Sequence, residues 1–356
     1  MCKLESPDEP IALKDDYVPS GLTVVIPNYN GVQLFQQTLA PLFDTLATLP
    51  CPFEVIVVDD CSTDESLIYL QSKYPSIRLF RNEKNSGFAT TINKGIKEAK
   101  YELILLLNSD IILTKDYFHH QFRYFSDSNT FGVMGRIIGW DNDVIQDAAR
   151  YPKFHMLKIK TSFNYVVKPE SKDVVYTLYL SGANALVKRD KIVEIGGFDE
   201  LYSPFYVEDC DLSLRAWRMG WKCYYEHKAV CRHRTSSSIK SKNKKQYIET
   251  IYNRNKLYLH GIHLPGYLLP LYIMQMILES LFKAVLFRFT LLKAVGLFFS
   301  NLNNWMRSRN KMRLLQKTHR SQLTVYDITS FIRRSVKNRR AIKFLSGQLV
   351  QTTELS

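Results

Sequence analysis

Short apolar runs and helically spaced apolar stretches alternate along the first third of the chain. Residues 23–26 form a run rich in β-branched side chains, and residues 32–46 carry apolar side chains three or four positions apart. The first pattern predicts a buried strand and the second an amphipathic helix. The same alternation predicts further strands and helices at 53–58, 67–70, 77–80, 87–99 and 103–107. It favours an α/β fold with a mostly parallel central sheet flanked by helices.

Acidic residues directly follow two of the predicted strands. The run 103–107 is apolar at every position and leads into Asn-Ser-Asp, which ends at Asp110; the run 53–58 leads into Asp59 and Asp60. Ligands of open α/β sheets bind at the carboxyl ends of the strands, so acids there are candidates for holding a metal ion and a phosphate. The alternative is that Asp110 only caps the next turn, as aspartate often does after a strand.

The spacing of apolar residues is irregular in the middle of the chain, where we expect strands at 176–180 and 185–187. A helix is predicted from Glu208 to a glycine stop at Gly220. Its first turn contains three acids, Glu208, Asp209 and Asp211. Acids in a first helical turn often serve only the helix dipole, so position alone does not make them functional.

The composition changes after Leu264. Residues 264–278 are almost free of charge, but the run is shorter than the about 20 apolar residues of a spanning helix and contains two prolines. We expect this segment to lie in a membrane interface; a short membrane hairpin, or a helix packed on the domain or on a dimer partner, are alternatives. The chain then divides into a loose leader (1–20), an α/β domain (21–245) and a C-terminal helical, membrane-associating extension (246–356).

The charge of the chain restricts the kinds of partner that it is expected to bind. The formal net charge is +14, with lysine and arginine concentrated after His227, which favours anionic partners such as nucleotide diphosphates or an acidic membrane surface. No nucleic-acid reading element is recognisable, so nucleic acid is not an expected partner. The six cysteines lack CxxC pairing, and the first residues lack the apolar core of a signal peptide; both favour a cytoplasmic setting.

Two common nucleotide-binding motifs are missing. The turn after the first predicted strand, residues 27–31, reads Pro-Asn-Tyr-Asn-Gly and contains no GxGxxG, and the chain contains no GxxxxGK[ST]. A dinucleotide-dependent oxidoreductase and a P-loop enzyme are therefore disfavoured. A sugar nucleotidylyltransferase normally begins with a glycine-rich nucleotide loop, which is also missing here.

Five segments occur in a fixed order along the chain: Val-Val-Ile-Pro-Asn-Tyr-Asn-Gly (24–31), Val-Ile-Val-Val-Asp-Asp-Cys-Ser-Thr-Asp (55–64), Asn-Glu-Lys-Asn-Ser-Gly-Phe-Ala (82–89), Asn-Ser-Asp (108–110) and Glu-Asp-Cys-Asp-Leu-Ser-Leu-Arg (208–215). In that order they closely resemble the family 2 glycosyltransferases of the GT-A fold. The resemblance covers residues 22–235. It implies an inverting transferase that uses a nucleoside diphosphate sugar, with a rhamnosyltransferase-like branch among the options.

The resemblance also implies a donor site. The turn after the first strand and the acids after the second strand would hold the base and the ribose. Three residues, which lie before and within the helix predicted at 87–99, would line the donor pocket. The segment Asn-Ser-Asp would take the DxD position of the family. These residues are Pro27, Asn28, Tyr29, Asn30, Asp59, Asp60, Asn85, Gly87, Asn93, Asn108, Ser109 and Asp110. Asp110 would contact Mg²⁺ or Mn²⁺. Asn108 departs from the pattern, and an amide is a weaker ligand for a hard cation, so strict metal dependence stays open.

The resemblance assigns the acid pair Glu208-Asp209 to the acceptor side. Direct displacement at the anomeric carbon needs a carboxylate to remove the proton of the acceptor hydroxyl, and Asp209 is the predicted general base. For Glu208 and Asp211 the alternative to a role in the site is a favourable interaction with the dipole at the start of the helix. His233 resembles a late histidine that touches the metal or diphosphate in some GT-A enzymes; a packed or surface histidine is the alternative.

Further residues have two interpretations each. Arg232, Arg234 and three serines could hold the leaving diphosphate or belong to a flexible loop, and two tryptophans could stack on a sugar or pack in the core. The serines and tryptophans are Ser236, Ser237, Ser238, Trp217 and Trp221. No Gln-x-x-Arg-Trp string follows, unlike in the processive synthases of the family, so transfer of a single sugar is expected.

These expectations combine into one hypothesis and one rival. The hypothesis is an inverting glycosyltransferase that moves one sugar from a UDP- or dTDP-sugar to a lipid-linked or glycan acceptor in cell-surface polysaccharide biosynthesis. It would act in the cytoplasm, peripherally on the inner face of the cell membrane. The rival is a catalytically silent nucleotide-sugar-binding scaffold of the same fold, suggested by Asn108. The oligomeric state is open.

Overall fold

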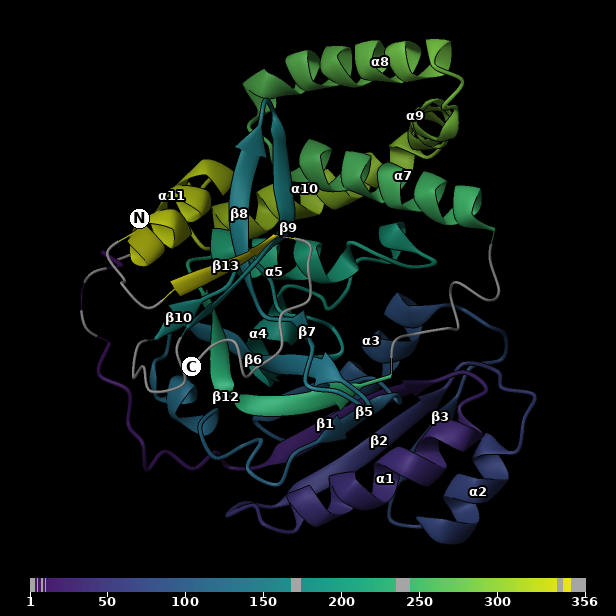
Figure 1. The fold of residues 1–356 in the computed structure, drawn as a ribbon, viewed down its shortest axis with the longest axis vertical. Helices are drawn as coiled ribbons and strands as arrows, with labels where there is room; N and C mark the ends of the chain where they lie inside the picture. Colours follow the sequence, from purple (N-terminus) through teal and green to yellow (C-terminus); the bar gives the residue numbers. More distant parts are fainter. Residues whose placement is uncertain are drawn as a thin grey trace.

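A ten-stranded mixed sheet forms the centre of the molecule (Figure 1). The computed structural model describes residues 4, 6–7, 9, 11–167, 174–234, 244–337 and 342–346. The main path of the sheet runs β10-β12-β6-β11-β4-β1-β2-β3, with β5 paired to β12 and β7 to β6. Its strands are β1 (Leu22–Asn28), β2 (Phe53–Asp59), β3 (Arg78–Arg81), β4 (Leu103–Leu107), β5 (Ile111–Leu113), β6 (Thr130–Gly139), β7 (Ile145–Asp147), β10 (Val175–Tyr176), β11 (Asn184–Lys188) and β12 (Lys222–His233).

The strands predicted in the first third of the chain pair as expected. β1 lies between β2 and β4, and both pairings are parallel, as is that of β2 with β3. All five residues of β4 are buried, because the sheet is covered on both faces there. β11 is antiparallel to β4 and to β6, which makes the sheet mixed. The carboxyl ends of β1, β2, β4, β6 and β12 therefore share one edge.

Helices cover this sheet and connect its strands. They are α1 (Val32–Leu46), α2 (Ser66–Lys73), α3 (Phe88–Glu98), α4 (Arg189–Glu194) and α5 (Glu208–Arg218), with short 3₁₀ turns η1 (Phe122–Ser126) and η2 (Glu200–Tyr202). α3 lies very close to the sheet at Gly95, where an added Cβ would be 2.2 Å from Val25 Cγ1. Only glycine allows this approach, which brings the amino end of α3 to the edge where β1 and β2 end.

A second, three-stranded sheet projects from the domain. β8 (Ala149–His155) and β9 (Lys158–Val167) form a hairpin, and β13 (Ile342–Ser346) pairs with β9. The tip of the hairpin reaches the C-terminal helices (Figure 1). Ile159 N donates a hydrogen bond to His260 Nε2 at 2.9 Å, and Lys158 forms an ion pair with Glu279.

The C-terminal extension is helical, as predicted, and packs on the α/β domain. Its elements are α7 (Lys245–His263), η3 (Gly266–Leu268), α8 (Leu269–Val285), α9 (Thr290–Ser300), α10 (Leu302–Thr318) and α11 (Val325–Lys337). The sequence-based length estimate for the apolar segment is too short. Residues 266–285 form one helical stretch of 20 residues, apolar and long enough to cross a membrane by length and composition. Within it, Glu279 pairs with Lys158 and accepts from Gln275 Nε2 at 2.7 Å.

The described part of the predicted leader is attached to the domain. Tyr17 Oη donates to Glu102, and Ser20 N donates to Glu102 Oε2 at 2.9 Å. Lys14 N donates to Ser126 Oγ at 3.0 Å. Residues 11–20 therefore form an ordered strap rather than the loose segment expected from their polar, proline-containing composition, because the partners that hold them lie far away in the sequence.

Candidate active site

The end of β1 is fixed by a buried hydrogen-bond network. Asn28 Nδ2 donates to Asp59 Oδ1 at 2.8 Å and to Ser62 Oγ at 3.1 Å. Asp59 is fully buried and also accepts from Ser62 N at 3.0 Å. Asp59 was predicted to contact the donor nucleotide, but its carboxylate faces the interior and holds two strand ends together. Its role is structural.

The turn that follows β1 presents Tyr29 to solvent. Asn30 adopts φ 55°, and its Oδ1 accepts from Thr63 N at 2.8 Å, which ties this turn to the one after β2. Tyr29 is 43% exposed at the tip. Pro27 is still part of β1, opposite Val58. The turn is therefore rigid and offers an aromatic ring at the carboxyl edge of the sheet.

Asp60 organises the loop that leads into α3. Its Oδ1 accepts from Asn82 Nδ2 at 2.9 Å and from Ser86 N at 2.8 Å, and its Oδ2 accepts from Gly87 N at 2.9 Å. Gly87 has φ 83°, a conformation that favours glycine. Asn85, at the tip of this loop, is exposed. Asp60 thus sets the shape of the loop; its contact with a ribose stays a prediction.

Asn93 is held by the backbone of Phe198 in this structure. Its Nδ2 donates to Phe198 O and its Oδ1 accepts from Phe198 N, both at 2.8 Å. The neighbouring Gly197 has φ 64°, and an added Cβ would lie 2.3 Å from Asn93 Oδ1. Asn93 therefore docks the 196–199 turn onto α3, because its side-chain amide matches both backbone hydrogen-bonding groups of Phe198; its contact with a donor stays a prediction.

Asp110 and His233 come together after β4 and at the end of β12. His233 Nε2 lies 3.4 Å from Asp110 Oδ2, and Asp110 Oδ1 is buried without a hydrogen-bond partner. His233 Nδ1 lies 2.7 Å from Gln146 Oε1, and Gln146 Nε2 donates to the His233 carbonyl at 3.3 Å. Gln146 Oε1 can only accept a hydrogen bond, so His233 Nδ1 carries the proton. In the neutral ring, His233 Nε2 then keeps its lone pair beside Asp110. This arrangement fits a cation.

The other two residues of the Asn-Ser-Asp segment are positioned by their backbones. Asn108 N donates to Ala183 O at 3.1 Å, and the Ser109 carbonyl accepts from Thr38 Oγ1 at 3.1 Å. Among the described residues, no group of three or more histidine, cysteine or acidic side chains gathers around a common point. The chain would therefore supply few ligands to a cation, and oxygens of a diphosphate and water would complete its coordination.

Two acids with raised pKa values begin α5. Burial is the main cause that raises the pKa of Asp209 to about 6; Asp147 adds to it, whereas the Cys210 N–H and Arg150 lower it. Burial and then the charge of Asp209 raise the pKa of Glu208 to about 8. Asp209 accepts one hydrogen bond, from Cys210 N at 2.7 Å. Burial therefore raises both pKa values above those of ordinary acids, and the charge of Asp209 adds to the shift of Glu208.

Two residues that no sequence motif marks, Asp147 and Arg150, influence the pKa of Asp209. Asp147, at the end of β7, pairs with Arg150 at the start of β8 at 2.8 Å. The Arg150 guanidinium lies 5.2 Å from the centre of the Tyr179 ring, and its Nε is buried without a partner. No motif marks these residues, since they belong to the irregular middle of the chain. They place one acid and one cation in the electrostatic surroundings of Asp209.

Asp211 has a clear structural role. It is 1% exposed and accepts from Tyr202 Oη at 3.0 Å, Arg215 Nε at 2.8 Å and His263 Nε2 at 2.9 Å. The charge of Arg215 and the bond from His263 outweigh burial and hold the pKa of Asp211 well below its usual range. Asp211 thus fastens α5, and with it Asp209, to α7 of the extension, a stronger role than the expected helix-start electrostatics.

Contacts connect Asp60 to Asp209 at the carboxyl edge. Asp60 holds Gly87, and the next side chain, Phe88, reaches Gly182. A Cβ at Gly182 would lie 3.4 Å from Phe88 Cζ and 3.9 Å from Asp209 Cβ. The residue after Gly182 accepts the hydrogen bond from Asn108 N, two positions before Asp110. These contacts therefore connect the segments that carry Asp60, Asp110 and Asp209 at the carboxyl edge of the sheet.

This geometry agrees with the comparison of the sequence with protein families. The family model described as Glycosyl transferase family 2 matches residues 23–195. Residues 23–195 therefore form a family 2 glycosyltransferase domain. The matched part contains β1 to β4, the strands whose carboxyl ends carry Asp60 and Asp110.

Curated relatives match part of this glycosyltransferase. It is 23% identical over 214 residues to "Poly-beta-1,6-N-acetyl-D-glucosamine synthase" of Staphylococcus aureus (strain COL), and 23% identical over 215 residues to the protein of the same name from Staphylococcus epidermidis. Each match covers 59% of this chain and 49% of the relative. The chain thus spans about half the length of the curated relatives it matches.

Solved structures confirm the GT-A fold of this glycosyltransferase. GalNAc-T7 with UDP, GalNAc and Mn²⁺ gives a TM-score of 0.59 at 15% identity, covering 89% of this chain and 58% of that one. The mannosyltransferase PcManGT from Pyrobaculum calidifontis, in complex with GDP-Man and Mn²⁺, gives 0.51 at 16% identity, covering 92% and 89%.

Most other candidate residues of the glycosyltransferase are engaged by partners within the protein. Trp217 is fully buried with Nε1 donating to Thr177 O, and Trp221 is 9% exposed beside Phe131, so both pack in the core. Arg232 binds three carbonyls of the 139–142 loop and pairs with Asp143 at 2.8 Å. Arg234 is exposed, and its N–H donates to the Asp110 carbonyl at 3.1 Å. Ser236, Ser237 and Ser238 lie outside the described residues.

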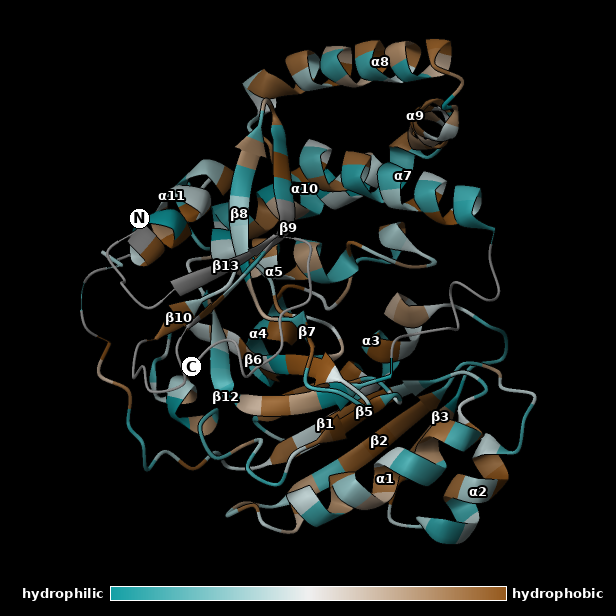
Figure 2. Ribbon diagram, in the orientation of Figure 1, coloured by the Kyte–Doolittle hydropathy of each residue, from teal (hydrophilic) through white to brown (hydrophobic). Residues whose placement is uncertain are grey.

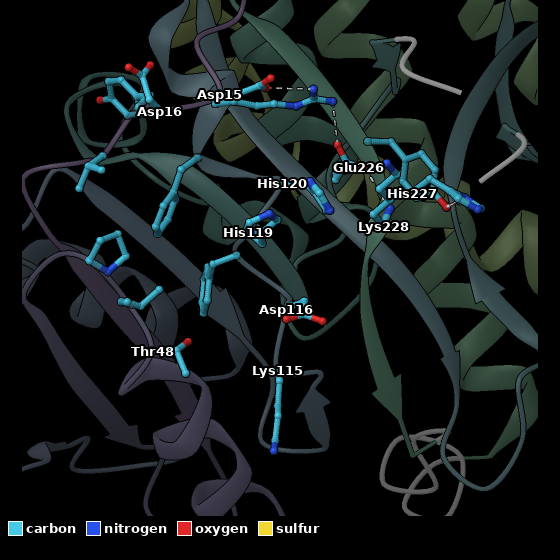
Figure 3. A pocket seen from close by; sticks show the side chains of 18 of the residues that line it. Asp15, Asp16, Thr48, Lys115, Asp116, His119, His120, Glu226, His227 and Lys228 are labelled. Carbon is cyan, nitrogen blue, oxygen red and sulfur yellow. Dashed lines mark hydrogen bonds and ion pairs between the residues drawn. The ribbon is translucent and has the colours of Figure 1, made fainter. Parts of the chain in front are cut away.

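A cavity of about 720 Å³ lies at the opposite edge of the sheet (Figure 3). It is lined by residues 15–18 and 48–50, which precede β1 and β2, and by residues 226–228 of β12. Titratable side chains such as Asp116, His119 and Lys228 share its wall (Figure 3). Because β1 and β2 begin there, this cavity is separate from the acids that follow the strands.

Proposed function

We propose that this glycosyltransferase moves a single sugar, with inversion, from a UDP- or dTDP-sugar to a lipid-linked or glycan acceptor in cell-surface polysaccharide biosynthesis. One observation carries the proposal: Asp209, whose pKa is raised, lies against Gly182, and the next residue, Ala183, accepts from Asn108 N in the segment that leads to the Asp110–His233 pair. The fold neighbours carry UDP or GDP-mannose with Mn²⁺, and the relatives are named as polysaccharide synthases; both support this donor and pathway class.

Asp209 would act as the general base. The acceptor oxygen forms a bond to the anomeric carbon while the bond from that carbon to the diphosphate breaks, and the hydroxyl proton passes to an Asp209 oxygen. A pKa of about 6 leaves the carboxylate ionised at neutral pH and makes it a stronger base than an ordinary aspartate. Glu208, with a pKa of about 8, stays protonated there and can donate a hydrogen bond to the acceptor.

Asp110 and His233 would hold a divalent cation, Mg²⁺ or Mn²⁺. When bound, such a cation neutralises charge on the leaving diphosphate. The unpartnered Asp110 Oδ1 and the oriented His233 ring suit this role. Asn108 replaces an acid of the family pattern, which weakens the expected affinity for the cation.

Removal of Asp110 should abolish metal-stimulated transfer. Asp110→Ala deletes an acidic ligand, and we expect a fall of roughly 100-fold in turnover at saturating donor because the diphosphate loses several kcal/mol of charge stabilisation. Release of nucleoside diphosphate during a Mn²⁺ titration measures this. Asp116→Ala, an exposed acid at the far cavity, is the matched control and should behave as wild type. Equal Mn²⁺ curves for both variants would contradict the assignment.

The Asp147–Arg150 pair should shift the pH profile of kcat/KM in a predictable direction. Arg150 lowers the pKa of Asp209 and Asp147 raises it. Arg150→Gln should therefore move the acidic limb of kcat/KM to higher pH, with a roughly threefold loss at pH 6, whereas Asp147→Asn should move it to lower pH. The two profiles are recorded with the same donor and acceptor. Shifts of the same sign would show that the residues do not act through charge on Asp209.

A donor and acceptor screen tests the proposed function. Purified protein is incubated with UDP-, dTDP- and GDP-sugars and an acceptor panel, with and without Mn²⁺, and nucleoside diphosphate release and product length are measured. Addition of one sugar supports the proposal; long polymers would instead match the name of the curated relatives. Nucleotide binding without transfer or hydrolysis would favour the silent scaffold.

A further inference from the structure

The outer side of α8 and the turn into α9 expose large apolar side chains. Phe282 is 67% exposed, Val285 76% and Phe287 85%. On the inner side of α8, Tyr272 and Met276 are each 1% exposed. Apolar residues therefore surround the helix, although only its inner side is covered. A helix that is apolar all round needs a second apolar neighbour.

We call the exposed part the α8–α9 surface and define it by Leu271, Met274, Leu278, Phe282, Val285 and Phe287. It lies at one extremity of the molecule, along the brown stretches of α8 (Figure 2). An apolar groove of about 490 Å³ runs along α8 between Leu269 and Leu278. Contiguous exposed apolar area of this kind marks an interaction surface.

The charges around the surface have one sign. Lys283, Arg288 and Lys293 are exposed on α8, the turn and α9. The acid within residues 266–300 is Glu279, which is already paired with Lys158 of the β8–β9 hairpin. A second copy of the chain on this surface would bring like charges together, whereas anionic lipid headgroups would complement them.

We propose that the α8–α9 surface lies in the interface of an anionic lipid bilayer, with α8 parallel to the membrane plane. The exposed apolar side chains would enter the headgroup and upper acyl region, about 5–10 Å deep, while the three cations contact headgroup phosphates. Crossing the membrane would instead separate α8 from the hairpin and expose Tyr272 and Met276. This inference goes beyond the proposed function, since docking requires no catalysis.

Vesicle flotation with the full chain tests the inference. Wild-type protein should float with phosphatidylcholine vesicles containing about 30% phosphatidylglycerol and much less with phosphatidylcholine alone. The double variant Phe282→Asp, Phe287→Asp should lose flotation at least tenfold. Neutralising Lys283, Arg288 and Lys293 to Gln should weaken binding to the anionic vesicles about fivefold per cation. Ile68→Asp, in α2 at the opposite extremity and 68% exposed, is the matched control and should float as wild type.

A gain of signal complements these losses. Phe287→Trp should give tryptophan fluorescence that brominated lipids quench in the anionic vesicles. This measurement does not depend on a substitution that disrupts the surface. Hydrolysis of soluble donor by every variant separates a failure of docking from a failure of the proposed function. The inference would be overturned if the double variant floated as well as the wild type, or if the wild type did not float. The inference would also be overturned if light scattering showed a dimer for the wild type and a monomer for the double variant, because a second copy would then cover the surface.

Discussion

Asp209→Asn is expected to reduce sugar transfer by about 10²–10⁴-fold while leaving the fold and nucleotide binding intact. The amide keeps the shape of the side chain and can still accept from Cys210 N, but it cannot take the acceptor proton. In the wild-type protein, kcat/KM should rise with pH through about 6, since Asp209 must lose its proton to act as base. The variant should lose this limb of the profile.

The control for this substitution is another acid at a helix start. Asp190 lies in the first turn of α4, is exposed, and accepts from Lys191 N at 2.7 Å, as Asp209 does from Cys210 N. Asp190→Asn removes the same dipole interaction without touching the site, so its rate should equal that of wild type. Wild-type transfer by Asp209→Asn would eliminate Asp209 as the base and with it the mechanism.

Asp211→Ala is expected to lower the free energy of unfolding by about 3–5 kcal/mol, because it leaves Arg215 and His263 buried without their acceptor. Urea titration followed by circular dichroism measures the change. The folded-state pKa of Asp211 is depressed below its ordinary value, so its contribution is present above about pH 4 and is lost as the pH falls through the folded-state pKa. The difference between variant and wild type should therefore shrink in acid.

A surface ion pair provides the comparison. Asp143 pairs with Arg232 at 2.8 Å, but its side chain is 55% exposed, so Asp143→Ala should cost no more than about 1 kcal/mol. An Asp211→Ala protein with the same urea midpoint as wild type would show that the buried cluster does not hold α5 to the extension.

The predicted site divides into residues that local pattern located and residues whose role depended on distant partners. Asp110 was located because a continuous apolar strand ends just before it, and burial of β4 on both faces confirms that reasoning. The docking role of Asn93 could not be predicted, since its partner Phe198 lies 105 residues away. Asp147 and Arg150 carry no local pattern; they matter only because β7 and β8 bring them to the start of α5.

The sequence by itself determined the alternation of strands and helices, the parallel pairing of β1 to β4 and the acids at their carboxyl ends. Hydrophobic periodicity and strand-end position are local properties, and burial of apolar side chains enforces them wherever the chain folds. The tertiary structure alone decided which polar groups remain for a ligand. Asp59 and Asp211 are enclosed by donors from remote segments, whereas Asp209 receives one hydrogen bond. It also decided which side of the apolar α8 stays exposed, because that depends on what packs against it.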